Sequence, residues 1–383
     1  MTRKKLLKIA LYSILSILVL AMIGGGYLWY SVKHTIDAMY EPLPEKAWTQ
    51  PVFEQERIET DEGAEVADAA GVSDAPEPAA TAVGGGVPAA EVTVLGQSAD
   101  SEPKDNREAD ADYRDAVSGS SVKLDAGLVE RLLHPDLSNQ EPFCILLLGV
   151  DERAGDRGRS DTMILLSVQP AKKSVLALSI PRDTRVLIPE REYYDKINHS
   201  YAFGGTSLAV AAVERLFGVP IAYYMKTNME GMIDIVETVG GVDVNNPFTF
   251  KYEGHVFSEG ELHLNGYEAL SFVRMRYDDP HGDFGRTQRQ RNVLSSLVDK
   301  VASFRTIGKL PHILSQLSKD VRTNLTSGDM LDLASDYRSS IENIETLYLN
   351  GKGKTINGIY YYTVRPEDRK AIHNRIIAHL QAS

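Results

Sequence analysis

The chain of 383 residues contains a single cysteine, Cys144, and none of the short motifs that mark several large enzyme classes. It has no G-x-S-x-G of serine hydrolases, no glycine-rich loop of P-loop ATPases, no H-E-x-x-H of zinc peptidases and no C-x-x-C pair. One cysteine cannot form an internal disulfide, and its apolar neighbours predict that it is buried. Serine-hydrolase, P-loop and zinc chemistry therefore have no support.

Basic residues are also in short supply, because 41 Lys and Arg stand against 53 Asp and Glu, a net charge of −12. The acidity is concentrated between Glu54 and Asp112, where sixteen acidic and three basic residues give −13 and leave the rest of the chain at +1. A protein without a basic surplus is poorly suited to the phosphates of DNA or RNA. We therefore expect no nucleic-acid partner.

The N-terminus predicts a membrane anchor. Residues 1–8 carry four basic side chains, and the uncharged run Ile9–Val32 follows. At about 1.5 Å per helical residue, this run is long enough to cross a hydrocarbon layer of roughly 30 Å, with the basic end in the cytoplasm. A cleaved signal peptide is the alternative, but no A-x-A cleavage site follows. We expect a retained transmembrane signal anchor over 9–32 in a single-pass type II protein of the cell membrane, with the remainder extracellular.

Residues 33–125 have the composition of a disordered acidic tether. The stretch is rich in Ala, Glu, Asp, Pro and Gly. Low hydrophobicity and a high like charge do not offset the conformational entropy lost on folding. Only the part up to about Trp48, which carries Tyr40 and Leu43, is expected to be more ordered.

Residues 126–383 have the pattern of one globular α/β domain. Apolar runs of strand length alternate with amphipathic helical segments. This alternation predicts an αβα sandwich in which a central mixed sheet is covered on both faces. The expected strands are Phe143–Val150, Thr162–Val168, Ser174–Ile180, Ile221–Lys226 and Ile359–Val364, and the expected helices are Leu208–Phe217, Met229–Val239, Met330–Tyr337 and a closing helix from Pro366.

An arginine-rich stretch, Leu262–Val301, predicts an anion site. Alternation over Ser271–Arg276 favours a strand that presents Arg274 and Arg276 on one face, and helical spacing begins at about Thr287. Arg286, Arg289 and Gln290 then lie in or beside the first helical turn, where backbone N–H groups favour an anion such as phosphate. The alternative is a solvated basic face with ordinary surface salt bridges.

Carboxylates at strand ends predict a metal site. Asp151 follows the first strand and Asp161 opens the second, so the two frame one loop. Mg²⁺ prefers one or two carboxylates together with water and phosphate oxygens. The alternative is that both Asp residues cap turns or pair with neighbouring arginines. After the third strand, Pro181–Arg185 brings Arg182 and Arg185 to the same rim, unless it is only a turn with an internal Arg–Asp pair.

These segments together resemble the LytR-CpsA-Psr family. The matching motifs stand in the order Leu147–Arg153, Arg159–Thr162, Ile180–Asp183, Lys196–Tyr201, Gly240–Asp243 and Arg274–Gln290. The resemblance implies a phosphotransferase that moves an anionic glycopolymer, such as a teichoic acid, from an undecaprenyl-pyrophosphate carrier to peptidoglycan. A hydrolase of lipid pyrophosphates and a non-catalytic polymer-binding or regulatory protein of the cell wall are the alternatives.

The resemblance also implies roles for individual residues. Asp151 and Asp161 are expected to hold Mg²⁺ or Mn²⁺, and either Asp161 or Asp283 to act as general base. The expected catalytic residues are Asp151, Asp161, Arg182, Arg276 and Asp283. The expected pyrophosphate ligands are Arg153, Arg182, Arg274, Arg276, Arg286 and Arg289, to which the residue pattern adds Arg185 and Gln290. A polyprenyl groove is expected along Leu208, Ala212, Leu216, Met232, Ile233 and Val236.

Overall fold

The computed structural model describes residues 30–44, 53, 123–152, 155–275, 279–280, 282–303, 318–337, 339–340 and 343–381. Within the helix formed by Gly282–Ser303, the side chains of residues 282–284, 287, 298–299 and 301–303 are outside this description. Arg153, Arg276 and most of the expected span and tether also lie outside the described residues.

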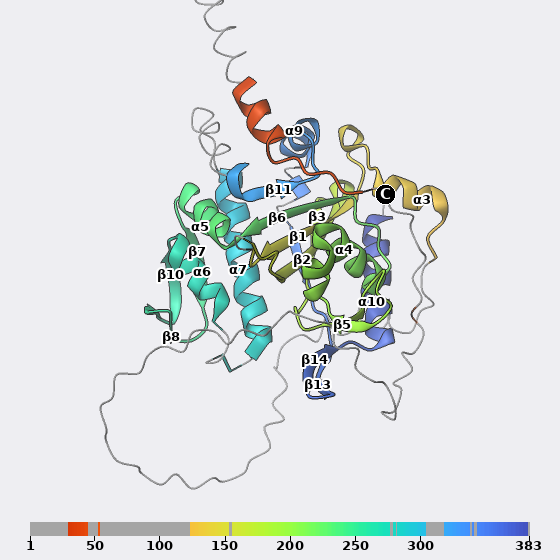
Figure 1. Ribbon diagram of the computed structural model, residues 1–383. Helices are drawn as coiled ribbons and strands as arrows, with labels where there is room; N and C mark the ends of the chain where they lie inside the picture. Colours follow the sequence, from red (N-terminus) through yellow and green to blue (C-terminus); the bar gives the residue numbers. More distant parts are fainter. Residues whose placement is uncertain are drawn as a thin grey trace, which may run out of the picture.

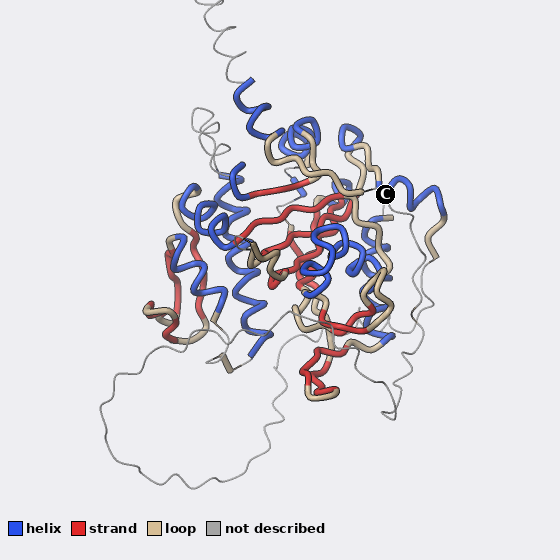
Figure 2. The backbone as a smooth tube through the Cα atoms, in the orientation of Figure 1, coloured by secondary structure: helices blue, strands red, loops and turns tan. Residues whose placement is uncertain are grey.

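A six-stranded mixed sheet forms the centre of the domain, in the order β11-β6-β1-β2-β3-β12 (Figures 1 and 2). Pairs β1–β6 and β3–β12 are parallel, and the other pairs are antiparallel. The expected α/β fold with a central mixed sheet is therefore confirmed, and β1 has the predicted bounds. The strands are β1 (Phe143–Val150), β2 (Ser160–Gln169), β3 (Ser174–Ser179), β6 (Tyr223–Asn228), β11 (Val321–Thr323) and β12 (Ile344–Leu347).

Helices cover both faces of this sheet because successive side chains of a strand point to opposite sides. Leu146 and Leu148 of β1 lie in a core, called here the first core, with helices α3 (Ala126–Leu133), α4 (His199–Phe217) and α10 (Pro366–Leu380). Phe143 and Ile145 lie in a core on the other face, against helix α9 (Ser327–Asp336). Cys144 is fully buried in the first core, and burial raises the pKa of its thiol to about 12.

Local signals set several helix ends as predicted. Helix α5 (Met229–Thr238) begins after Asn228, whose side chain accepts a hydrogen bond from the Gly231 N–H at 2.7 Å. Helix α10 begins with Pro366 in its first turn. Helix α4, in contrast, begins at His199, nine residues before the predicted start. Gly204 and Gly205 adopt non-helical angles that kink the helix between the two positions. The kink interrupts the apolar periodicity that the sequence pattern follows.

The strand predicted over Ser271–Arg276 is wrong, because residues up to Arg274 belong to helix α6 (Gly266–Arg274). Asn265 and Glu268 form a capping box that starts the helix, with side-chain to backbone distances of 3.0 Å in both directions. Gly266 permits close approach to α5, since a Cβ there would lie 2.6 Å from the Ile233 carbonyl oxygen. The cap therefore overrides the alternation that favoured a strand.

A second core lies beside the sheet, at the left of Figure 1. Its centre is a cluster of Phe250, Phe257 and Phe272, whose ring centroids lie 4.8–5.7 Å apart. This core carries the long helix of the arginine-rich stretch. Its elements are α5, β7 (Val242–Asn246), β8 (Phe250–Tyr252), β9 (His255–Phe257), β10 (Gly260–Leu264), α6 and α7 (Gly282–Ser303).

Two short hairpins complete the domain at the lower edge of Figure 1. Strands β4 (Arg185–Leu187) and β5 (Tyr194–Lys196) form one, and β13 (Lys352–Ile356) and β14 (Ile359–Thr363) form the other. An isolated bridge between Thr184 and Tyr362 joins the two hairpins. The strand predicted near the C-terminus is therefore present, outside the central sheet.

Residues 30–44 pack against the domain. Residues 30–37 are helical, and Ile36 and Met39 form a small buried cluster with Val321 of β11. Leu43 packs against the first core, which also contains Leu124 on the far side of the acidic stretch. The folded unit thus includes residues that the expected tether of 33–125 contained. From Tyr30 onward, in the described parts of the chain, no helix has the length and apolar character needed to cross a membrane.

A buried histidine fastens the C-terminal helix to the sheet. The Nδ1 and Nε2 atoms of His379 lie 2.8 Å from Ser167 Oγ and 2.9 Å from Ser174 Oγ. The Gln169 side chain also donates to the His379 carbonyl at 3.1 Å. Burial, together with Lys172 and Arg375, lowers the pKa of His379 to about 4. The imidazole is therefore neutral at physiological pH.

We predict that the free energy of unfolding falls as the pH drops from about 6.5 to about 4. In this range the unfolded chain protonates His379 but the folded protein does not, so the loss amounts to about 2–3 kcal/mol. Urea unfolding across this range should show a shallower pH dependence in His379→Gln than in wild type. His134 is exposed, so His134→Gln serves as the control. Equal slopes in wild type and His379→Gln would contradict the assignment.

Candidate active site

Asp151 and Asp161 lie at the same end of the antiparallel pair β1–β2. The register shifts there, from Gly149 opposite Thr162 to Val150 opposite Ser160. The Asp151 N–H closes the connecting loop by donating to the Arg159 carbonyl at 2.9 Å. Gly158 has φ +66°, and a Cβ at this position would lie only 1.8 Å from the Asp151 carbonyl oxygen. Glycine is therefore required to close the loop.

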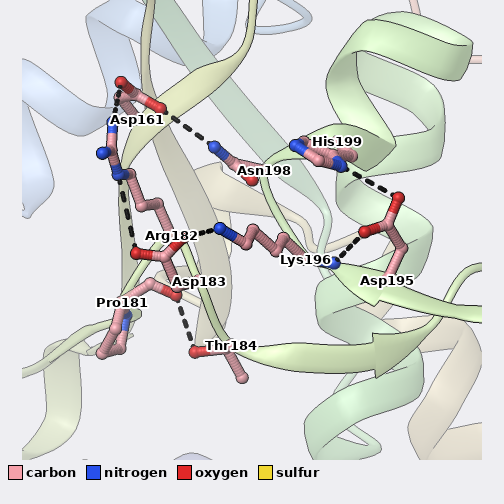
Figure 3. Close-up of polar contacts among 9 residues, drawn as sticks. All are labelled: Asp161, Pro181, Arg182, Asp183, Thr184, Asp195, Lys196, Asn198 and His199. Atoms are coloured by element: carbon pink, nitrogen blue, oxygen red, sulfur yellow. Dashed lines mark hydrogen bonds and ion pairs between the residues drawn. The ribbon is translucent and has the colours of Figure 1, made fainter. Parts of the chain in front are cut away.

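The Asp161 carboxylate is the centre of the polar cluster in Figure 3. Arg182 Nη1 donates to one of its oxygens at 2.6 Å, and Asn198 Nδ2 donates to the other at 3.0 Å. The side chains of Asp161 and Arg182 are 29% and 20% exposed, so the ion pair remains accessible to solvent. Three segments that are distant in sequence therefore meet at one carboxylate.

A second acidic residue organises the cation side of the cluster (Figure 3). Asp183 lies 2.9 Å from Lys196 Nζ and 3.8 Å from Arg182 Nε. Its carbonyl accepts from the Tyr362 N–H at 2.8 Å, which attaches the loop to strand β14. Two cations and two carboxylates thus alternate within a few ångströms, which favours polar ligands that carry charge.

His199 has a carboxylate partner that sequence reasoning did not identify. Its Nδ1 atom lies 2.9 Å from Oδ2 of Asp195, a residue of strand β5 (Figure 3). No helical spacing signals this pair, because Asp195 belongs to β5 and α4 begins only at His199.

Helix α7 reaches this cluster through Gln290. Its Nε2 atom donates to Thr162 Oγ1 at 2.9 Å, on the residue that follows Asp161. Arg286 stands one helical turn before Gln290 and is 4% exposed. The structure therefore brings Gln290 of the arginine-rich stretch to the strand that carries Asp161.

Arg289 is closed within the second core. Its guanidinium pairs with Asp279, donates to the Met275 carbonyl, and donates through Nε to the Phe272 carbonyl at 2.8 Å. The side chains of this ion pair are only 2% and 1% exposed. Burial lowers the pKa of Arg289, and Asp279 acts in the opposite direction. Arg289 therefore joins Asp279 and the end of α6 to α7 instead of presenting its donors at the surface.

The family model described as the LytR_cpsA_psr family matches residues 92–377. The chain belongs to the LytR-CpsA-Psr family. A Bacillus cereus protein named polyisoprenyl-teichoic acid–peptidoglycan teichoic acid transferase TagU is 47% identical over 248 residues, covering 64% of this chain and 82% of the relative.

Solved structures of LytR-CpsA-Psr proteins share the fold. The crystal structure of B. subtilis TagU has a TM-score of 0.53 and 40% identity, covering 63% of this chain and 98% of that one. The structure titled TagT bound to LI-WTA has a TM-score of 0.55 and 29% identity, covering 64% of this chain and 93% of that one.

Other residues expected to bind pyrophosphate in this LytR-CpsA-Psr protein have different surroundings. Arg274 pairs with Glu253 at 2.9 Å, and Arg185 stacks on the Tyr194 ring at 4.0 Å. Arg153 and Arg276 lie outside the described residues, and only the backbone of Asp283 is described. The partners Glu253 and Asp279 had not been singled out from sequence, because neither stands at a short, regular spacing from its arginine.

The six residues of the expected lipid groove are divided between two cores. Residues 208, 212 and 216 are buried in the first core, whereas Val236 is buried in the second and Met232 packs against it. Ile233 faces Gly266 of α6. The six residues are therefore divided between the cores that α4 and α5 cover, and the lipid groove stays a prediction.

The residues around Asp161 are suited to an oxygen-liganded cation. Asn198 is 3% exposed, and its Oδ1 atom is buried without a hydrogen-bond partner among the described residues. The amide nitrogen of Asn198 faces Asp161, and a carboxylate and an amide oxygen from one cluster are ligands that Mg²⁺ and Mn²⁺ accept. No group of three or more His, Cys, Asp or Glu side chains with metal-binding geometry occurs in the described part of the chain. Any cation here must therefore complete its shell with amide, water or substrate oxygens.

We predict that Asp279→Asn lowers the free energy of unfolding by about 3–5 kcal/mol, because it leaves the buried charge of Arg289 uncompensated. Urea denaturation measures the loss. The matched control is Glu345→Gln, which breaks the exposed pair with Arg375 and should cost less than about 1 kcal/mol. Similar losses in both variants would show that the buried pair contributes no more to the free energy of unfolding than the exposed one.

Proposed function

We propose that this protein transfers an anionic glycopolymer of the teichoic acid type from an undecaprenyl-pyrophosphate carrier to a hydroxyl of peptidoglycan. The observation that carries the proposal is the Asp161 cluster, in which Arg182 and Asn198 donate to one carboxylate at a strand end and Gln290 donates to the neighbouring Thr162. The relatives named as teichoic acid transferases support the polymer and the acceptor.

The reaction needs positioning and charge neutralisation more than a covalent nucleophile. The acceptor oxygen attacks the phosphorus atom that bears the polymer, and the bond from that phosphorus to the bridging oxygen breaks. Undecaprenyl phosphate leaves with the electron pair, and the hydroxyl proton passes to Asp161 or Asp283. In this proposal Arg182 binds an oxygen of the pyrophosphate, and Arg286 and Gln290 of α7 are further ligands.

Asp151, Asp161 and the Asn198 amide oxygen are the residues that would hold Mg²⁺ or Mn²⁺. Such a cation supplies neutralisation of the developing phosphate charge. Asn198 also orients Asp161 through its 3.0 Å hydrogen bond. One residue therefore controls both the position of the carboxylate and the oxygen set beside it.

The topology forms part of the proposal. The basic residues of 1–8 and the uncharged run of 9–32 support a single-pass anchor with a cytoplasmic N-terminus. This arrangement places the domain outside the cell, where peptidoglycan lies, and next to the membrane that holds the lipid carrier.

We expect Arg182→Ala to reduce transfer at least about 100-fold, because a donor to the reacting phosphate is lost. The assay supplies radiolabelled polymer on its lipid carrier to full-length protein in proteoliposomes with peptidoglycan, and measures label on glycan strands. Arg375→Ala removes an exposed arginine of α10 and should leave transfer unchanged. Label that appears in solution would indicate a lipid-pyrophosphate hydrolase, and lipid that stays intact would indicate a binding protein.

We expect Asn198→Ala to weaken Mn²⁺ binding about tenfold, because the variant removes both an amide oxygen and the hydrogen bond that orients Asp161. Electron paramagnetic resonance of added Mn²⁺ measures free and bound metal without any substrate. Asn139→Ala, on the exposed surface, is the control. Unchanged Mn²⁺ affinity in Asn198→Ala would exclude this residue from the cation site.

A further inference from the structure

The segment that follows residues 30–37 runs along the edge of the central sheet. The Glu41 N–H donates to the Thr323 carbonyl at 2.7 Å, and the Thr323 N–H donates to the Met39 carbonyl at 3.0 Å. The Tyr224 hydroxyl donates to the Glu41 carbonyl at 2.7 Å. These three bonds fix the backbone at Glu41 on β11 and β6, close to the position where the expected membrane span ends.

The Glu41 side chain turns toward the sheet and pairs with Lys226 of β6. The distance from Lys226 Nζ to Glu41 Oε2 is 3.1 Å, and the lysine side chain is only 15% exposed. A lysine this far from solvent needs a fixed anionic partner. Glu41 therefore determines where the ammonium group lies.

Lys226 in turn meets Tyr201, a buried residue in the first turn of α4. Its Nζ atom lies 3.5 Å from the Tyr201 hydroxyl, which donates to Glu152 Oε2 at 3.2 Å. Burial, followed by the nearby Glu152 and Glu41 carboxylates, raises the pKa of Tyr201. The hydroxyl therefore stays protonated. It donates a hydrogen bond to Glu152 and accepts one from Lys226.

The chain of contacts ends beside the candidate active site. Glu152 directly follows Asp151, at the start of the loop that returns to Asp161. Strands β1 and β6 are parallel, with Lys226 opposite Leu148, so Lys226 lies near the same end of the sheet. A residue close to the expected membrane exit is thereby connected to a residue adjacent to an expected metal ligand.

We propose that Glu41 is a positioning residue for the reaction at this site, acting through Lys226 and Tyr201 on Glu152 and the Asp151 loop. The inference rests on the proposed function for the identity of the donor substrate. It assigns a role in the site to the segment after the expected span, which sequence composition had placed within a tether.

The test is a double-mutant cycle in the full-length protein. Glu41→Gln and Tyr201→Phe remove a charge and a hydroxyl with little change in volume. Each should lower kcat for consumption of the lipid-linked donor about tenfold, with donor KM within about twofold, because the catalytic groups and not the binding surface are displaced. The double variant should be no slower than the slower single variant, since both changes break the same chain.

The control is Asp37→Asn, which breaks an exposed ion pair with Lys33 in the same segment. It should leave kcat unchanged, and all variants should unfold within a few degrees of wild type. Unchanged kcat in Glu41→Gln, or multiplicative losses in the double variant, would overturn the inference. Its failure is separable from that of the proposed function, because the cycle follows donor consumption whereas transfer is judged by label on glycan strands.

Discussion

The carboxylate of Asp161 is the point on which the candidate site depends. It accepts hydrogen bonds from Arg182, which follows β3, and from Asn198, which precedes α4. The two segments are distant in sequence, and a side chain from each donates a hydrogen bond to this one carboxylate. Asp161 itself is placed by the β1–β2 pairing. The sheet thus positions the carboxylate, and the carboxylate accepts hydrogen bonds from both loops.

Arg182 and Arg289 differ in how accessible their guanidinium groups are. Arg182 pairs with a carboxylate that remains partly exposed, so a phosphate oxygen can compete for the same guanidinium. Arg289 has its acceptors enclosed among aromatic rings, with Asp279 as counter-ion. A buried pair of this kind is costly to break and adds little net stability compared with an apolar core. Its contribution is to join Asp279 and the end of α6 to α7, the helix from which Gln290 reaches Thr162.

Most of the sheet was predictable from the sequence because its signals are local. The apolar run of β1 and the Asn228 cap of α5 each act within a few residues. Helix α6 was missed because its six-residue alternation also fits a helix face, and the deciding cap at Asn265 stands outside that window.

The candidate site was predictable only in part. The meeting of Asp161 with Arg182 followed from the rule that strand ends share an edge. The pairing of Glu41 with Lys226 joins residues 185 positions apart and leaves no spacing pattern to detect. The same holds for the closure of Arg289 by Asp279, which depends on burial that composition alone does not reveal.

The positions of Leu43 and Leu124 have a consequence for how this protein tolerates change in length. Both residues contact the first core, so the two ends of the acidic stretch are held at the same core. The entropic cost of bringing the two ends of a loop together rises only slowly with the number of residues in the loop. Its length can therefore vary without altering the separation between residues 30–37 and Asp161. This makes the stretch a natural insertion point, where a foreign module can be added without displacing the site.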